Sequence, residues 1–156
     1  MSLPSLSSPW PLGVFSSDVL IRRLYSFTNS TGDAKPVYLE FGHDTTIDMA
    51  LTGLGLAKDT PTLSAKGPVR SSRKFRTSYQ VPFAAQMLWE KFSCTSSFDG
   101  PQVRLVLNDA PFPLATCKGV DRRYGSCALD DFVASYASSI EHSWGDARWN
   151  ATCGGV

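Results

Sequence analysis

The sequence has almost no net charge and no long hydrophobic run. Fifteen Lys and Arg residues stand against fourteen Asp and Glu residues, which leaves a formal net charge of +1 over 156 residues. The chain therefore lacks the charge excess that would attract nucleic acid or a charged membrane. No apolar stretch reaches the roughly 18–20 residues that a membrane-spanning helix needs. With 42% hydrophobic and 19% charged residues, the composition predicts a soluble globular protein of one domain, with neither a nucleic-acid nor a membrane partner.

The beginning of the chain lacks the features of a secretory signal. Residues 1–13 hold no basic residue, and three prolines interrupt their apolar positions. A signal peptide instead has a basic start followed by an uninterrupted apolar stretch. The composition predicts a disordered or artefactual extension over 1–13 and a domain over 14–156.

Other features nevertheless favour a secreted, extracellular protein. The cysteines lack the paired CxxC spacing that is typical of zinc sites, so no metal site is expected and disulfides are the better interpretation. Two Asn-x-Ser/Thr sequons, at Asn29 and Asn150, are candidates for glycosylation. Because these features occur without a signal, we expect the native N-terminus to be missing from this sequence. The four cysteines are Cys94, Cys117, Cys127 and Cys153.

Hydrophobic periodicity predicts a mixture of helices and strands. Apolar residues at helical spacing predict helices, whereas short β-branched or aromatic runs predict strands. The expected helices cover 18–27, 46–57, 83–92 and 130–140, and the expected strands cover 37–41 and 103–107. Residues 108–111 supply turn chemistry, so the second strand should form a hairpin with 112–114. The aromatic residues expected to lie in the core are Phe83, Trp89 and Phe92.

His43 and Asp44 fall between an expected strand and an expected helix. Free backbone N–H groups and the helix dipole favour anion binding at such a turn. A histidine there can donate a hydrogen bond to a phosphoryl oxygen, and a neighbouring carboxylic acid can protonate a departing alkoxide. The alternative is that Asp44 only caps the helix and His43 is a packing residue. The pattern by itself leaves both interpretations open.

The segment 58–76 is locally basic. Six cations share this Thr-, Ser-, Pro- and Gly-rich loop with a single acid, Asp59. Clustered cations raise the local concentration of polyanions such as inositol hexakisphosphate, but a charge run is more often a solvated surface. Both interpretations remain open. The cations are Lys58, Lys66, Arg70, Arg73, Lys74 and Arg76.

Four segments, in order, resemble a known family. Residues 38–47, Tyr-Leu-Glu-Phe-Gly-His-Asp-Thr-Thr-Ile, followed by the small and apolar 50–56, are similar to the His-Asp signature of histidine acid phosphatases, especially fungal phytases and acid phosphatases. Residues 81–85, Val-Pro-Phe-Ala-Ala, resemble a further segment of that family. The strand and turn over 103–109, and the cysteine loop and helix over 117–133, resemble two more.

The resemblance implies a fold and a chemistry. The fold is α/β, the C-terminal part of the phosphoglycerate-mutase-like α/β sandwich domain of histidine phosphatases, with an incomplete sheet. The family hydrolyses phosphate monoesters through a phosphohistidine, with no metal or other cofactor. By resemblance, Asp44 is the proton donor and His43 contacts phosphate. The implied partner is a small-molecule phosphate monoester, phytate being one possibility, and the full-length family member is secreted.

The nucleophile of the family is not found in this sequence. It lies in an Arg-His-Gly-x-Arg-x-Pro motif, and the second of the two histidines, His142, has no arginine before it and no glycine after it. An acid without a nucleophile cannot form the covalent intermediate, so we expect this chain to be inactive alone. Two hypotheses follow: a phosphomonoester hydrolase represented by an incomplete chain, or a non-catalytic phosphate-binding or interaction remnant.

The resemblance also suggests how the cysteines pair. Cys117 and Cys127 resemble the short-range disulfide of the family, which would staple a loop. Cys94 and Cys153 would pair with cysteines of an upstream region. In this chain we expect them to be free, mispaired or joined to each other.

Overall fold

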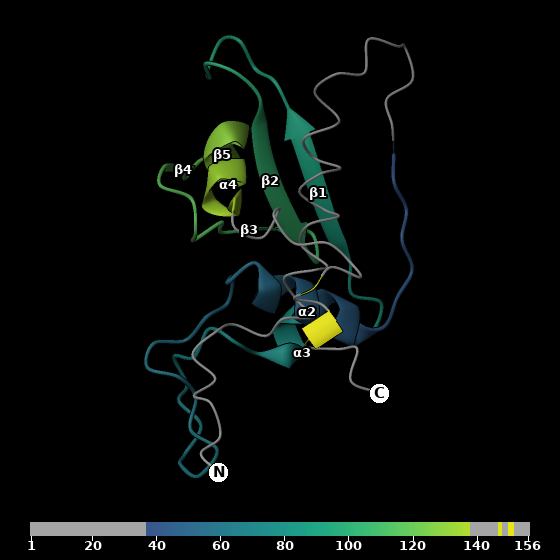
Figure 1. Ribbon diagram of the computed structural model, residues 1–156, viewed down its shortest axis with the longest axis vertical. Helices are drawn as coiled ribbons and strands as arrows, with labels where there is room; N and C mark the ends of the chain where they lie inside the picture. Colours follow the sequence, from purple (N-terminus) through teal and green to yellow (C-terminus); the bar gives the residue numbers. More distant parts are fainter. Residues whose placement is uncertain (1–36, 138–146, 148–149, 152–156) are drawn as a thin grey trace.

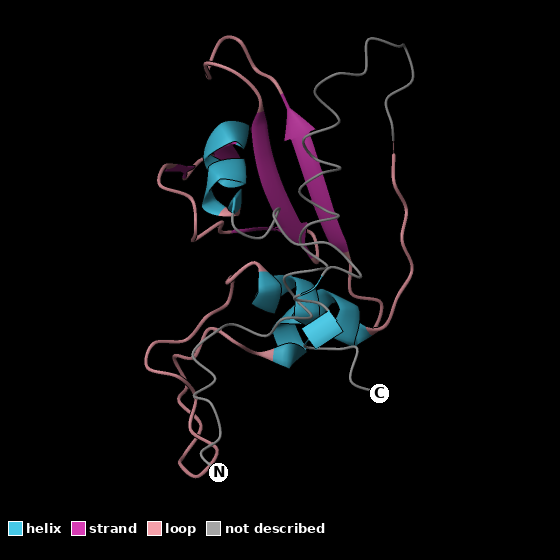
Figure 2. Cartoon of the chain, viewed as in Figure 1, coloured by secondary structure: helices cyan, strands magenta, loops and turns pink. Residues whose placement is uncertain are grey.

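The computed structural model describes residues 37–137, 147, 150 and 151 (Figure 1). Within this part of the chain, Figure 2 shows an antiparallel sheet with one helix against it, and a group of helices followed by a long loop. The helices are α2 (Asp44–Gly53), α3 (Thr77–Gln80) and α4 (Leu129–Ser135), and the strands are β1 (Met87–Phe92), β2 (Gln102–Leu107), β3 (Ala110–Phe112), β4 (Val120–Asp121) and β5 (Ser126–Ala128). The predicted helix over 18–27 lies outside the described residues. None of the described helices is long and apolar enough to cross a membrane.

Strand β2 organises the sheet. Its whole length pairs antiparallel with β1, from Met87 opposite Leu107 to Phe92 opposite Gln102. Its other edge is shared, because β5 pairs with the first half and β3 with the second half, both antiparallel. Strand β4 then pairs with β5. The described strands therefore run in the order β1-β2-β5-β4, with β3 beside β2.

One face of β2 meets α2 and α4 in a common core. Alternate residues of a strand point to the same face, and Val103, Leu105 and Leu107 are all buried. They join buried residues that come from α2 and the turn after it, from the loop after β3, from β5, and from α4 and the residue that follows it. Because the end of α2 is part of this core, the core also fixes the helix that begins at Asp44. The contributing side chains are Leu51, Leu54, Leu56, Leu114, Cys127, Leu129, Phe132 and Tyr136.

The predicted hairpin is present, but its return strand is β3, Ala110–Phe112, and not the predicted 112–114. Strand β2 turns into β3 through Asn108 and Asp109, which have φ angles of 50° and 64°. Two successive positive φ angles characterise the type I′ turn, whose twist matches that of a β-hairpin and which Asn and Asp tolerate better than other non-glycine residues. The Asn108 side chain further secures the turn, because its Oδ1 accepts a 3.0 Å hydrogen bond from the backbone N–H of Gln86.

The predicted strand over 37–41 is wrong. These residues form a loop leading into α2, and no described strand pairs with them (Figure 2). Their apolar side chains are exposed, Val37 by 77%, Leu39 by 79% and Phe41 by 97%. A short run of β-branched and aromatic residues favours a strand, and here Val37, Leu39 and Phe41 alternate with Tyr38 and Glu40. The pattern therefore indicated a strand, but a strand also needs neighbours to hydrogen-bond with.

The predicted helix over 83–92 is also wrong. Its first residues form a turn in which Ala84 has a φ of 58°, and its remainder is β1. Across the β1–β2 register, Glu90 faces Arg104 and forms an ion pair with it. Such cross-strand pairs, together with backbone pairing along six residues, outweigh an apolar spacing that also fits a helix.

The core prediction for the aromatic residues of this segment fails for Phe83, whose side chain is fully exposed. Trp89 does pack against the core, with its ring 5.5 Å from that of Phe132. Phe92 is half-buried and packs edge-on against Phe98 at 6.2 Å.

The other two helices are present in modified form. The helix predicted over 46–57 begins at Asp44 and ends at Gly53. Gly55 follows with a φ of 63°, the left-handed conformation that glycine adopts at little cost where a helix ends. The helix predicted over 130–140 is α4, which ends at Ser135, and residues 138–140 lie outside the described part of the chain.

Candidate active site

His43 and Asp44 lie at the start of α2, and both side chains are exposed. His43 is the N-cap residue, with extended backbone angles of φ −90° and ψ 168°, and its carbonyl accepts a 2.9 Å hydrogen bond from the N–H of Thr46. Asp44 is the first helical residue. The sequence predicted a strand before these two residues and a helix after them. The helix is present, whereas the segment before them is a loop.

The alternative interpretation, in which Asp44 caps the helix, is correct in part. The His43 side chain makes no capping hydrogen bond. One carboxylate oxygen of Asp44, Oδ1, accepts a 2.7 Å hydrogen bond from the N–H of Thr45. An acid in the first turn also interacts favourably with the helix dipole. Asp44 thus stabilises the start of α2, although it stands one residue beyond the cap position. Its exposure to solvent leaves it accessible to a substrate.

Gly42 allows the chain to approach the first turn closely. A Cβ atom added at Gly42 would lie 2.7 Å from Oγ1 and 3.2 Å from Cβ of Thr46. Both distances are shorter than ordinary van der Waals contacts, so a larger residue would push Thr46 aside. The glycine therefore helps to set the backbone from which His43 and Asp44 project.

A second carboxyl, Asp48, lies one turn further along the same helix face. Residues four apart on a helix are neighbours, and the charge of Asp44, after partial burial, is the second cause that raises the pKa of Asp48. Its Oδ1 is buried and has no hydrogen-bond partner among the described residues. Sequence reasoning missed this residue, although the spacing of four from Asp44 was the available signal.

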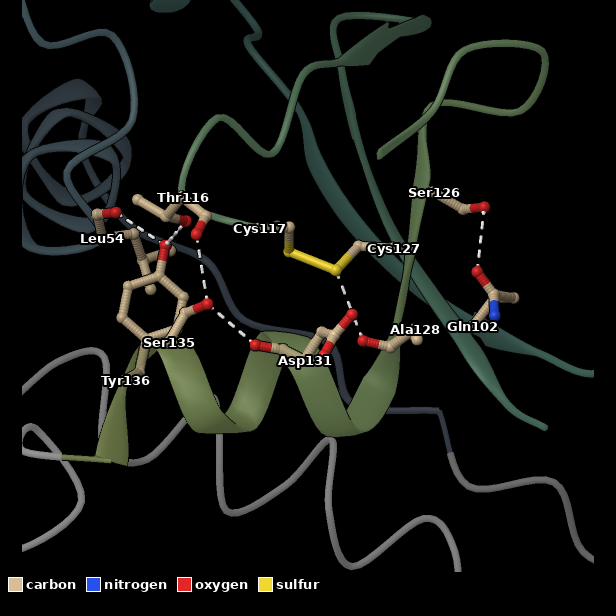
Figure 3. Close-up of a disulfide and its surroundings, with 10 residues drawn as sticks. All are labelled: Leu54, Gln102, Thr116, Cys117, Ser126, Cys127, Ala128, Asp131, Ser135 and Tyr136. Carbon is tan, nitrogen blue, oxygen red and sulfur yellow. Dashed lines mark hydrogen bonds between the residues drawn. A yellow bond between two sulfur atoms is a disulfide. The ribbon is translucent and has the colours of Figure 1, made fainter. Parts of the chain in front are cut away.

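The far end of α2 is held by a network of hydrogen bonds (Figure 3). The Tyr136 hydroxyl donates to the Leu54 carbonyl at 2.6 Å and lies 2.5 Å from the Thr116 hydroxyl. The Ser135 hydroxyl lies within hydrogen-bond distance of the carbonyls of Thr116, at 3.1 Å, and Asp131, at 2.8 Å. This network joins the end of α2, the loop after β3 and α4. Burial of the Tyr136 side chain raises the pKa of its hydroxyl group.

Cys117 and Cys127 form a disulfide beside this network (Figure 3). The pairing that the family resemblance implied is present, and it closes the loop that carries β4. Cys94 is a half-buried free thiol. Its Sγ lies 3.4 Å from the Ser96 hydroxyl, and hydrogen bonding to Ser96 and Ser97 lowers the pKa of the thiol. The free thiol is one of the three states expected for Cys94, and Cys153 lies outside the described residues.

The remaining sequence-predicted sites are only partly described. Asn29 lies outside the described residues, whereas Asn150 is exposed. Glycosylation at either asparagine remains a prediction. Within the described part of the chain, no group of three or more His, Cys, Asp or Glu side chains is placed to hold a metal ion.

Comparison with known proteins defines the class. The model of the histidine phosphatase superfamily, branch 2, matches residues 11–108, which is more than half of the chain and includes the His43–Asp44 site. The chain belongs to this superfamily. The predicted family is therefore confirmed, as is the predicted α/β class with an incomplete sheet.

The individual relatives are fungal proteins. Phytase A of Aspergillus oryzae is 32% identical over 154 residues, which cover 86% of this chain and 32% of the relative. Phytase A of Arthroderma benhamiae is 37% identical over 111 residues, covering 67% and 24% of the two chains. An acid phosphatase of Komagataella pastoris is 32% identical over 125 residues, covering 78% and 25%. The chain therefore spans a quarter to a third of the length of these relatives.

Proposed function

We propose that the site at His43 and Asp44 is the leaving-group half of a phosphomonoester hydrolase active site. Asp44 protonates the departing alkoxide as the P–O bond breaks, and His43 donates a hydrogen bond to a phosphoryl oxygen. The substrate class is a small-molecule phosphate monoester, phytate included. The proposal rests on membership of the histidine phosphatase superfamily, together with relatives called phytase and acid phosphatase.

The position of the two residues supports this chemistry. The positive end of a helix dipole favours binding of the negatively charged phosphoryl group. Both side chains are exposed at that end of α2, so a phosphate ester can reach them from solvent. Because Asp44 uses Oδ1 to hold the N–H of Thr45, the carboxyl group has a defined orientation. Proton transfer to a substrate requires such positioning.

The chain supplies only part of the reaction. Its 156 residues contain no Arg-His-Gly-x-Arg-x-Pro sequence, which is where the resemblance places the nucleophilic histidine. Protonation of the leaving group accelerates a displacement but does not replace the attacking atom. We therefore propose that this polypeptide hydrolyses phosphate monoesters only when another polypeptide region provides the nucleophile.

A second candidate is a non-catalytic phosphate-binding domain. The observation that favours it is the same missing nucleophile motif, since a His-Asp pair at a helix start can bind phosphate without turnover. The two candidates differ in what Asp44 does. In the binding domain its substitution changes phosphate affinity, whereas in the hydrolase half it changes the rate of bond cleavage.

A hybrid enzyme tests the proposal. Residues 14–156 would replace the matching third of Phytase A of Aspergillus oryzae, and hydrolysis of a chromogenic phosphate monoester would be measured. The hydrolase proposal predicts activity in the hybrid and none in the 156-residue chain. A folded hybrid that binds inorganic phosphate but shows no turnover would support the binding domain instead.

Secretion of the protein remains part of this proposal. The disulfide between Cys117 and Cys127 is of a kind that persists in oxidising compartments. The exposed Asn150 would be open to glycosylation there. The intact mass of the native product measures both modifications at once.

A further inference from the structure

The basic loop over 58–76 is closed at its base by its single acid. Both carboxylate oxygens of Asp59 accept hydrogen bonds from the far end of the loop, one from the N–H of Lys74 at 2.9 Å and one from that of Phe75 at 3.0 Å. These bonds, and then the nearby charge of Arg70, lower the pKa of Asp59. The Asp59 side chain is only 8% exposed. The one negative charge of the loop therefore binds the backbone, forms an ion pair with Arg70 at 3.8 Å and faces little solvent.

The loop lines a pocket of about 470 Å³ that is open to solvent on one side. This volume lies within the roughly 300–1,000 Å³ that is typical of sites for whole small molecules. Three arginines line it, Arg70, Arg73 and Arg76, and all three are half-buried. Apolar side chains line it as well, among them Leu63 and Val69. The pocket therefore combines positive charge with a carbon-lined wall.

The loop itself holds the three arginines in place. Arg70 donates from Nη2 to the carbonyl of Pro61 at 2.5 Å, and Arg73 donates from Nη1 to the carbonyl of Arg70 at 3.2 Å. Arg76 donates from Nε to the carbonyl of Arg73 at 3.0 Å. Each of these bonds uses one of the five N–H groups of a guanidinium. The arginines are thus positioned before any ligand arrives, which lowers the entropic cost of binding.

We propose that this pocket binds a small organic anion that carries two or more phosphate groups. Guanidinium groups recognise phosphate through paired hydrogen bonds, and a single phosphate would leave most of the volume unfilled. The apolar wall suits the carbon skeleton that joins the phosphates. Neither His43 nor Asp44 lines the pocket, so the site is separate from the candidate active site and does not depend on the proposed hydrolysis.

A solvated basic surface would have different features. Its cations would be exposed and mobile, as Lys58 and Lys66 are exposed here. Neither of these lysines lines the pocket. They carry the same charge as the pocket arginines within the same loop. The two lysines therefore provide a control for charge that is independent of pocket geometry.

Calorimetric titration of the 156-residue chain with fructose 1,6-bisphosphate and glucose 6-phosphate tests the proposal. The two probes have hexose skeletons and differ in the number of phosphates. We expect the bisphosphate to bind at least about tenfold more tightly, equivalent to about 1.4 kcal/mol, in buffer of physiological ionic strength. The double variant R73Q/R76Q should lose at least about tenfold in bisphosphate affinity, whereas the charge-matched K58Q/K66Q should lose less than about threefold.

Two further measurements distinguish binding in the pocket from binding elsewhere on the chain. Lys118→Gln should bind the bisphosphate as tightly as the wild type, because Lys118 is an exposed cation that does not line the pocket. Amide hydrogen exchange of the wild-type chain should slow over 59–77 when the bisphosphate is added, a result that does not depend on the folding of any variant. Equal affinity for the two sugar phosphates, equal losses in the two double variants, or unchanged exchange over 59–77 would overturn the proposal.

Discussion

The Tyr136 hydroxyl donates a 2.6 Å hydrogen bond to the carbonyl of Leu54, 82 residues earlier in the chain. Leu54 is the C-cap residue of α2, and His43 and Asp44 stand at the other end of the same ten-residue helix. Tyr136 follows directly after α4. One hydrogen bond therefore links the residue that follows α4 to the element that presents the candidate catalytic acid.

Substitution of Tyr136 by Phe should destabilise the fold by about 1–3 kcal/mol, because the Leu54 carbonyl would lose its partner inside the core. Urea unfolding monitored by circular dichroism measures this change. The matched control is Tyr79→Phe, since Tyr79 is 66% exposed. Equal unfolding midpoints for Tyr136→Phe and the wild type would show that the bond contributes nothing.

The raised pKa of Tyr136 predicts that the folded protein loses stability at alkaline pH. Burial raises the pKa of Tyr136 above its ordinary value of 10.0, so the folded state holds this proton more tightly than the unfolded state. The stabilising contribution is complete below pH 10 and is lost as the pH rises from there through the folded pKa. The stability gap between the wild type and Tyr136→Phe should therefore narrow above pH 10. A gap that stays constant to the highest testable pH would contradict the assignment.

Asp48→Asn should raise the stability of the protein at pH 7. Burial and the charge of Asp44 raise the pKa of Asp48 above 3.8, so its ionised form is disfavoured in the folded state. Protonated Asp48 therefore stabilises the folded state below pH 3.8, and this stabilisation is lost as the pH rises through the pKa of Asp48 in the folded protein. Thermal unfolding should show a higher midpoint for Asp48→Asn at pH 7 and no such gain at pH 3. The exposed Asp99 provides the control Asp99→Asn, and equal gains for both variants would refute the account.

Removal of the disulfide should weaken the sheet and α4 together. Cys117 and Cys127 are ten residues apart in sequence, and they join the loop after β3 to β5, immediately before α4. Replacing both with Ser should cost about 2–4 kcal/mol of unfolding free energy. A reducing agent should lower the unfolding midpoint of the wild type but not that of the double variant. Insensitivity of the wild type to the reducing agent would mean that the bridge is not formed.

The sequence carried enough information for the hairpin but not for its partner strand. The run over 103–107 alternates, and Asn108 with Asp109 supplies a turn of one particular type, so local signals agree with the final structure. Residues 87–92 have apolar positions that fit a helix as well as a strand. Only the pairing with β2 decides between the two, and pairing across a sheet is a non-local property.

At the candidate site, too, the local features could be predicted from the sequence and the features that depend on tertiary packing could not. His43 and Asp44 were identified because their motif is contiguous, and apolar spacing predicted the helix after them, although it placed the start at residue 46 and not at Asp44. Asp48 lay within reach of the same reasoning, but its burial depends on packing that the sequence does not display. The pocket within 58–76 depends on Asp59 reaching Lys74 and Phe75 across the loop. A charge count predicted the basic character of this loop but not its closed form.

The role of Asp44 is tested most directly by the dependence of the rate on the leaving group. In the hybrid that contains residues 14–156, kcat/KM would be measured for p-nitrophenyl phosphate and for an alkyl phosphate, before and after Asp44→Asn. A poor alkoxide leaving group needs the proton of a general acid far more than p-nitrophenolate does, and general acid catalysis contributes about 10²–10⁴-fold. We predict a loss of that size for the alkyl phosphate and a much smaller loss for p-nitrophenyl phosphate. Equal losses for both substrates would contradict the assignment of Asp44 as the proton donor.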